Sequence, residues 1–165
     1  MKLLCLIPAR KNSRRLKNKN FLKINGEMLI EKTIKLALKI KSFNEIIVSS
    51  DNQKINKLKN KYKKLEIINR PKNISKNNTP MSDVIKHSLK FFKMQNKKFD
   101  AVIVLQPTSP LRKKITIIKS IKKFVKYKLD YLASIKELKH TQFPKMVFKI
   151  TNKSLIKNMN FSVKN

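Results

Sequence analysis

The 165-residue sequence contains a single cysteine and no long apolar run. One cysteine, Cys5, allows no disulfide framework within the chain, which fits a reducing cytoplasm, and its place in an apolar run suits a small core residue. No apolar run approaches the roughly 20 residues of a membrane span. The apolar residues after Met1 end at Pro8, too soon for a signal peptide. We therefore expect a cytoplasmic protein that makes no use of a membrane.

Acidic residues are also scarce, since nine of them face 41 basic residues and leave a net charge of +32. Such a charge invites a nucleic-acid interpretation. Tryptophan is absent, however, and the lysines spread over every expected helix, whereas a nucleic-acid groove usually gathers its charge and adds aromatic side chains that stack on bases. Neutral substitution toward A/T-rich codons, which favours lysine at exposed positions, explains the composition better. We expect a weak, salt-sensitive attraction to polyanions and no specific nucleic-acid partner.

Apolar patterning alternates between strands and helices along the chain. Short apolar runs predict strands at residues 3–7, 45–49, 66–68, 101–105 and 131–135, with a further strand at 146–150. Apolar residues at helical spacing predict helices that begin near Glu27, after Asp51, at Met81 and before Ile117, and Gly26 predicts a turn. Continuous apolar strands separated by helices indicate an α/β fold with a mostly parallel sheet covered on both faces. Without a linker or a repeat, one domain over residues 1–165 is expected.

A cationic loop follows the first predicted strand. Open α/β sheets bind ligands at the loops that leave the carboxyl ends of their strands. This loop carries six cations and no acid: Arg10, Lys11, Arg14, Arg15, Lys17 and Lys19. Because these charges repel one another, a polyphosphate bound by charge-assisted hydrogen bonds is a natural occupant. A solvated basic loop in a very basic protein is the alternative interpretation.

Other polar residues also stand at expected strand ends or on helices. Asp51 follows the second strand, where a helix N-cap is the simpler interpretation and a functional acid the alternative. Asp83 and His87 lie four residues apart on an expected helix, so they can pair on one face and orient the polar loop before it. Gln106 and Ser109 lie in a loop that two prolines fix after the fourth strand, at the carboxyl edge of the sheet.

The cationic loop resembles the opening signature of the acylneuraminate (CMP-sialic acid type) cytidylyltransferases, a family that includes enzymes acting on pseudaminic and legionaminic acids. Further matches recur to about residue 150: Ser49-Ser50-Asp51, Arg70-Pro71, Asp83-Val84 with His87, Gln106-Pro107-Thr108-Ser109-Pro110-Leu111-Arg112, and His140. The resemblance implies a three-layer, Rossmann-like fold of the nucleotide-diphospho-sugar transferase type. It also places His140 near an arm that crosses to a partner subunit, although a surface histidine is an equal alternative. Lys11 stands where the family often has glycine.

By the same resemblance, the chain transfers a cytidylyl group from CTP to a nonulosonic acid for surface polysaccharide or flagellar glycosylation. The implied nucleotide-binding residues are Arg10, Ser13, Arg14, Lys19, Asn20 and Arg70. Arg10 and Lys19 would also be catalytic, neutralising charge on the α-phosphate and the leaving pyrophosphate. Gln106 and Ser109 would bind the sugar.

The resemblance further implies a magnesium ion, which the family holds with an Asp-x-Asp pair, and a homodimer. After Asp130 the sequence has one acid, Glu137, so we expect the protein ligands of that magnesium to be missing from the chain. The chain is expected to lack the family's C-terminal segment, and two alternatives to the active enzyme stay open. One is a truncated, inactive remnant that binds nucleotide. The other, less favoured, is a module that binds nucleic acid through charge alone.

Overall fold

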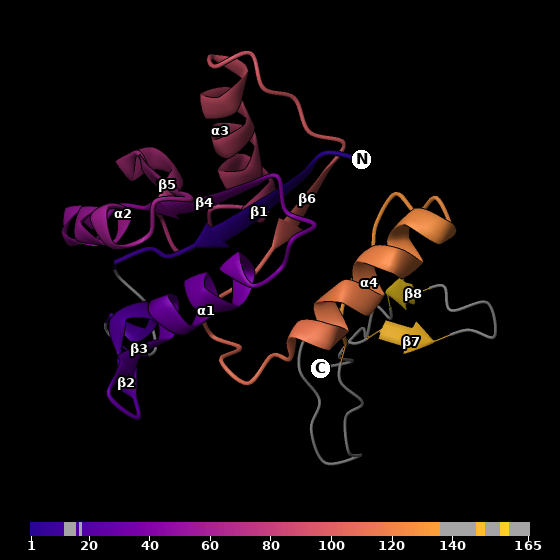
Figure 1. Ribbon diagram of the computed structural model, residues 1–165, viewed down its shortest axis with the longest axis horizontal. Coiled ribbons are helices and arrows are strands. Elements are labelled where there is room, and N and C mark those ends of the chain that lie inside the picture. Colours follow the sequence, from indigo (N-terminus) through magenta and orange to yellow (C-terminus); the bar gives the residue numbers. More distant parts are fainter. Residues whose placement is uncertain (12–15, 17, 136–147, 151–155, 159–165) are drawn as a thin grey trace, which may run out of the picture. The chain divides into compact units, whose positions relative to one another are not determined.

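The computed structural model describes residues 1–11, 16, 18–135, 148–150 and 156–158, and it divides the chain into two compact units, residues 1–123 and 124–165. Figure 1 shows the elements. The strands of the first unit are β1 (Leu3–Pro8), β2 (Lys23–Ile24), β3 (Glu27–Met28), β4 (Glu45–Ser50), β5 (Leu65–Asn69) and β6 (Ala101–Val104). Its helices are α1 (Leu29–Leu38), α2 (Lys57–Lys61) and α3 (Met81–Lys93), and three 3₁₀ turns lie at Lys19–Phe21, Gln53–Asn56 and Lys72–Ile74. Helix α4 (Lys114–Lys126) crosses the boundary between the units.

A four-stranded parallel sheet forms the centre of the first unit, in the order β5-β4-β1-β6. Four of the expected apolar runs become these strands, with ends that differ by at most one residue. In the central strand β1, Leu6 pairs in register with Ile47 of β4 and with Val104 of β6, and all its residues from Leu3 to Ile7 are buried. The prediction of an α/β fold with a mostly parallel sheet is confirmed.

Apolar side chains cover this sheet on both faces. One face packs α1 (through Ile30 and Ile34), Leu58 of α2 and Ile117 of α4 against Cys5 and its neighbours. The other face packs Val84 and Phe92 of α3 against the remaining alternate strand residues. Because strand side chains alternate in direction, each helical stripe meets one set of strand residues. The three expected layers are thus present, with α1 and α3 on opposite sides of the sheet (Figure 1).

A small hairpin corrects the predicted start of the first helix. Strands β2 and β3 pair antiparallel around Asn25 and Gly26, whose φ angles are 53° and 79°. These left-handed conformations suit Asn and Gly, and two such residues in a row are typical of a tight hairpin turn. The expected turn at Gly26 is confirmed, but Glu27 belongs to a strand, and α1 begins at Leu29.

The predicted strand at residues 131–135 is wrong, since the structure gives these residues no strand. Their apolar and aromatic composition favours extended backbone, but a strand also needs a hydrogen-bonded neighbour, which composition does not supply. In the second unit, β7 (Phe148–Ile150) pairs antiparallel with β8 (Ile156–Asn158) in a separate two-stranded sheet. The expected strand at 146–150 is therefore confirmed over its last three residues. His140 lies outside the described residues, and one domain over residues 1–165 stays a prediction.

Candidate functional site

The loops after β1, β4, β5 and β6 meet at one edge of the sheet, because the carboxyl ends of parallel strands lie together. The chain leaving β1 is fixed at this edge by backbone and side-chain bonds. The Ala9 amide donates to the Ser49 carbonyl (2.9 Å), and the Asn20 side-chain amide donates to the Arg10 carbonyl (3.1 Å). Asn20 is buried, and its hydrogen bond ties the 3₁₀ turn at Lys19–Phe21 to the segment just after β1.

A cavity of about 240 Å³ opens among these loops. The loops after β1, β5 and β6 contribute to its lining, and the loop after β4 does not. The lining residues are Pro8, Arg10, Lys19, Asn20, Arg70, Lys76, Asn77, Thr79, Met81, Val84, Gln106, Pro107 and Thr108. The lining contains four cationic side chains and no carboxylate among the described residues. This volume is below the roughly 300–1,000 Å³ typical of pockets for drug-sized ligands, so it suits one anionic part of a larger ligand.

The end of β4 and the residue after it fix the chain that leaves β1. The Ser50 hydroxyl donates to the Ala9 carbonyl (2.6 Å), and Oδ1 of Asp51 accepts from the Lys11 amide (2.5 Å). The interpretation of Asp51 as a helix N-cap is therefore wrong. Asn52 is the cap, because its side chain accepts from the Lys54 amide (3.1 Å), and Asp51 instead fixes the cationic loop.

Arg70 is anchored on the same strand end and is only 6% exposed. Its Nε donates to the Ser49 hydroxyl (3.0 Å) and its Nη2 to the Ser49 carbonyl (2.6 Å). The pKa of Arg70 is lowered to about 10, mainly by burial; Asp51 opposes this shift and Arg10 contributes to it. Arg70 therefore keeps its positive charge near neutral pH and presents it at the cavity from a fixed position.

Arg10 is held by the loop that follows β5, whose sequence indicates only a polar turn. Its Nη1 donates to Oδ1 of Asn77 (2.6 Å), 67 residues away. Lys76 and Asn77 both line the cavity. The sequence singles out neither of them, because a lysine and an asparagine in a turn-rich segment carry no signal that separates a binding loop from a solvated one.

The predicted site residues divide into three groups. Arg10, Lys19, Asn20, Arg70 and Gln106 line the same cavity, so the structure brings them together. Ser109 is exposed and outside this lining. Ser13 and Arg14 lie outside the described residues.

The loop that carries Gln106 and Ser109 closes on itself through long hydrogen bonds. The Ser109 amide donates to the Gln106 carbonyl (3.3 Å), and Nη2 of Arg112 donates to the same carbonyl (3.4 Å). Burial lowers the pKa of Arg112, which lies near the buried Cys5 thiol.

The expected pairing of Asp83 with His87 is not seen on α3. Nδ1 of His87 is buried and makes no hydrogen bond. Burial lowers the pKa of this imidazole, and the positive charges of Arg70 and Lys90 lower it further. His87 is thus a neutral side chain close to Arg70.

Magnesium needs oxygen ligands, preferably carboxylates. Within the described residues there is no group of three or more His, Cys, Asp or Glu side chains that could hold a metal ion. Oδ1 of Asp51 already accepts from the Lys11 amide. The residues that the structure describes therefore supply no set of side chains that could hold a magnesium ion at this edge by themselves.

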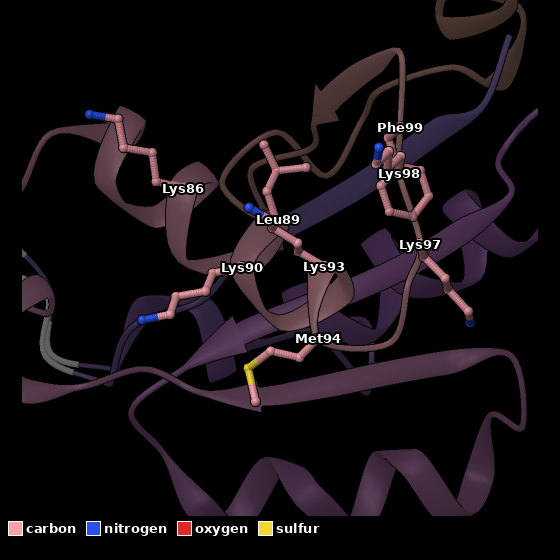
Figure 2. A pocket seen from close by; sticks show the side chains of 8 residues that line it. All are labelled: Lys86, Leu89, Lys90, Lys93, Met94, Lys97, Lys98 and Phe99. Atoms are coloured by element: carbon pink, nitrogen blue, oxygen red, sulfur yellow. The ribbon is translucent and has the colours of Figure 1, made fainter.

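A larger cavity of about 860 Å³ lies along the C-terminal half of α3 (Figure 2). Five of its eight lining residues are lysines, and Figure 2 shows Lys86 and Lys90 pointing away from Lys97. Lys97 already pairs with Glu45 (2.5 Å), and lysines near a helix C-terminus are favoured by the helix dipole. These lysines do not converge on one point, so the smaller cavity is the stronger candidate site.

Comparison with known proteins agrees with this geometry. The family model described as Cytidylyltransferase matches residues 4–156. Pseudaminic acid cytidylyltransferase of Campylobacter jejuni subsp. jejuni serotype O:2 is 31% identical over 140 residues, which are 85% of this chain and 60% of that protein. CMP-N,N'-diacetyllegionaminic acid synthase of Legionella pneumophila is 35% identical over 117 residues, which are 71% of this chain and 50% of that protein. The chain thus spans little more than half the length of these relatives.

Solved structures show the same fold. CMP:2-keto-3-deoxy-manno-octonic acid synthetase complexed with CTP has a TM-score of 0.60 at 20% identity, over 76% of this chain and 48% of that one. A cytidylyltransferase from Leptospira borgpetersenii has a TM-score of 0.57 at 21% identity, over 76% and 50%. Among the described residues, no helix has the length and apolar character that a bilayer span requires.

Proposed function

We propose a function for this chain from its membership of the cytidylyltransferase family, to which it belongs. It transfers a cytidylyl group from CTP to a nonulosonic acid of the pseudaminic, legionaminic or sialic type. The products are the CMP-sugar and pyrophosphate. The observation that carries this proposal is the cavity in which four cations meet without a neighbouring carboxylate in its lining. A polyphosphate supplies the negative charge that this lining lacks.

Arg10 and Lys19 have the central role in the proposed reaction. The sugar's anomeric hydroxyl gives up its proton to solvent water, and its oxygen forms a bond to the α-phosphorus. The bond from that phosphorus to the pyrophosphate oxygen breaks, and pyrophosphate leaves. Negative charge grows on the phosphate oxygens along this path, and fixed cations stabilise it more in the transition state than in the substrate. Both side chains line the cavity, which supports this assignment. Ser13 and Arg14 complete the phosphate contacts in this proposal.

The remaining contacts divide between nucleoside and sugar. Arg70 and Asn20 bind the nucleoside, and their fixed positions on Ser49 and on the Arg10 carbonyl suit them to select one base or ribose geometry. Gln106 binds the sugar acid, with Ser109 in the same loop. Gln106 and Ser109 follow β6, which is the neighbour of β1, the strand that precedes Arg10, Lys19 and Asn20. The sugar would therefore approach the α-phosphate from the strand beside the one that leads to the phosphate-binding residues.

Magnesium, a homodimer, a cytoplasmic location and a role in polysaccharide biosynthesis extend this proposal by resemblance to the family. Since the described residues supply no set of metal ligands, no step above runs through magnesium.

Pyrophosphate release tests the proposal directly. The protein is incubated with CTP, magnesium and each of pseudaminic, legionaminic and sialic acid, and CTP binding is measured by calorimetry beside ATP, GTP and UTP. We expect release of pyrophosphate with one of these sugars and a preference for CTP. Saturable CTP binding without turnover would instead support an inactive nucleotide-binding remnant. Equal, steeply salt-dependent binding of any polyanion would contradict both and support binding through charge alone.

A further inference from the structure

The contact between Arg10 and Asn77 joins two of the loops that line the cavity. Nη1 of Arg10 donates to Oδ1 of Asn77 at 2.6 Å, and both residues line the cavity. This amide oxygen is the only side-chain acceptor that the structure shows for Arg10 among the described residues. The guanidinium is therefore held in place by a neutral group.

The charge of that acceptor matters, because arginines in proteins are often held by carboxylates, which offset the positive charge they position. In this cavity no described lining residue is a carboxylate. Arg10 lies close enough to Arg70 for its charge to lower the pKa of that guanidinium. The nearby acid, Asp51, is bonded to the Lys11 amide, and it is not part of the lining.

We propose that Asn77 is a positioning residue, whose amide oxygen fixes the guanidinium of Arg10 at the cavity and leaves its full charge available to the phosphates of the bound nucleotide. This inference rests on the proposed function, because it takes a nucleoside triphosphate as the ligand. The added claim is that the side chain at position 77 must be uncharged. An aspartate there would keep the acceptor oxygen and the shape of the side chain, but its negative charge would offset the positive charge of Arg10.

The test compares Asn77→Asp with Asn77→Ala by calorimetry with CTP, CMP and cytidine. We expect Asn77→Asp to weaken CTP binding about tenfold, the usual effect of one lost charge-assisted contact, and to leave cytidine binding within about twofold. We expect Asn77→Ala to weaken CTP binding less, because Arg10 then loses its support and keeps its charge. Asn73→Asp is the matched control, since Asn73 is exposed in the same loop region, outside the lining, and carries the same change of net charge.

A purely structural role for Asn77 predicts the reverse order. Aspartate preserves the hydrogen bond and would be tolerated better than alanine, and any loss would be equal for CTP and cytidine. Either result overturns the proposal, as does a control variant that weakens CTP binding as much as Asn77→Asp. Parent protein that fails to bind CTP refutes the proposed function instead, so the two failures are distinguishable. Circular dichroism melting of each variant verifies that it is folded.

Discussion

Removal of the Ser49 hydroxyl tests the scaffold that holds Arg70. Ser49 is completely buried. Its Oγ accepts from Nε of Arg70 (3.0 Å), while its carbonyl accepts both from Nη2 of Arg70 (2.6 Å) and from the Ala9 amide (2.9 Å). Ser49→Ala deletes one oxygen atom and leaves the backbone contacts in place. The Nε proton of a buried guanidinium then has no acceptor.

The magnitude follows from these contacts. A hydrogen bond that involves a charged group contributes roughly 1.5–3 kcal/mol. Because the Nη2 bond to the carbonyl survives, we expect the lower part of that range, about 1.5–2 kcal/mol of unfolding free energy. For a chain of this length this corresponds to a fall in Tm of roughly 3–8 °C. Arg70 also becomes freer at the cavity, so we expect CTP affinity to fall by about threefold to tenfold.

The assay is thermal and urea unfolding beside calorimetry, with Ser88→Ala as the matched control. Ser88 is equally buried, but its hydroxyl donates within α3 to the Val84 carbonyl (2.8 Å). That carbonyl keeps its helical partner after the change, and alanine favours a helix. Ser88→Ala should therefore cost less than about 1 kcal/mol and leave CTP affinity unchanged. If Ser49→Ala melts like this control and binds CTP like the parent, the scaffold argument is refuted.

Two further predictions concern stability. Gly26 has a φ of +79° with nothing within 4 Å of the point that a Cβ would occupy, so Gly26→Ala should destabilise the protein by about 1 kcal/mol through backbone strain alone, visible as a lower Tm. Burial, Arg70 and Lys90 lower the pKa of His87 from its ordinary 6.5, so the unfolded chain takes up this proton more readily than the folded one. We therefore expect the Tm to be independent of His87 above pH 6.5 and to fall as the pH is lowered below 6.5. His87→Gln should flatten that part of the Tm–pH profile. An unchanged profile in this variant would exclude His87 as the cause.

Much of the fold was predictable because its signals are local. The apolar runs that became β1, β4, β5 and β6 are too short for helices and are separated by helical stripes. The failures involve partners that lie elsewhere in the chain. Residues 131–135 have strand-like composition and form no strand, and Glu27 pairs across a hairpin with Ile24 although it precedes a helical stripe.

The site was predictable where a motif and a strand end coincide, as at Arg10, Lys19, Asn20, Arg70 and Gln106, which share one cavity. The prediction for Asp51 was wrong because a local N-cap is the simplest role for an acid after a strand, whereas its partner is the Lys11 amide 40 residues away. Asn77 was missed for the same reason, since its contact with Arg10 spans 67 residues. Sequence spacing gives no measure of such contacts.

Calorimetric titration of CTP into the double variant Arg10→Ala/Lys19→Ala tests the central claim, that the cations of this cavity bind a nucleoside triphosphate. At about tenfold for each lost contact, we expect a loss of affinity of roughly a hundredfold. The control Lys122→Ala/Lys123→Ala removes the same charge from two exposed positions and should bind like the parent. CTP affinity equal to the parent in the Arg10→Ala/Lys19→Ala variant would contradict the account.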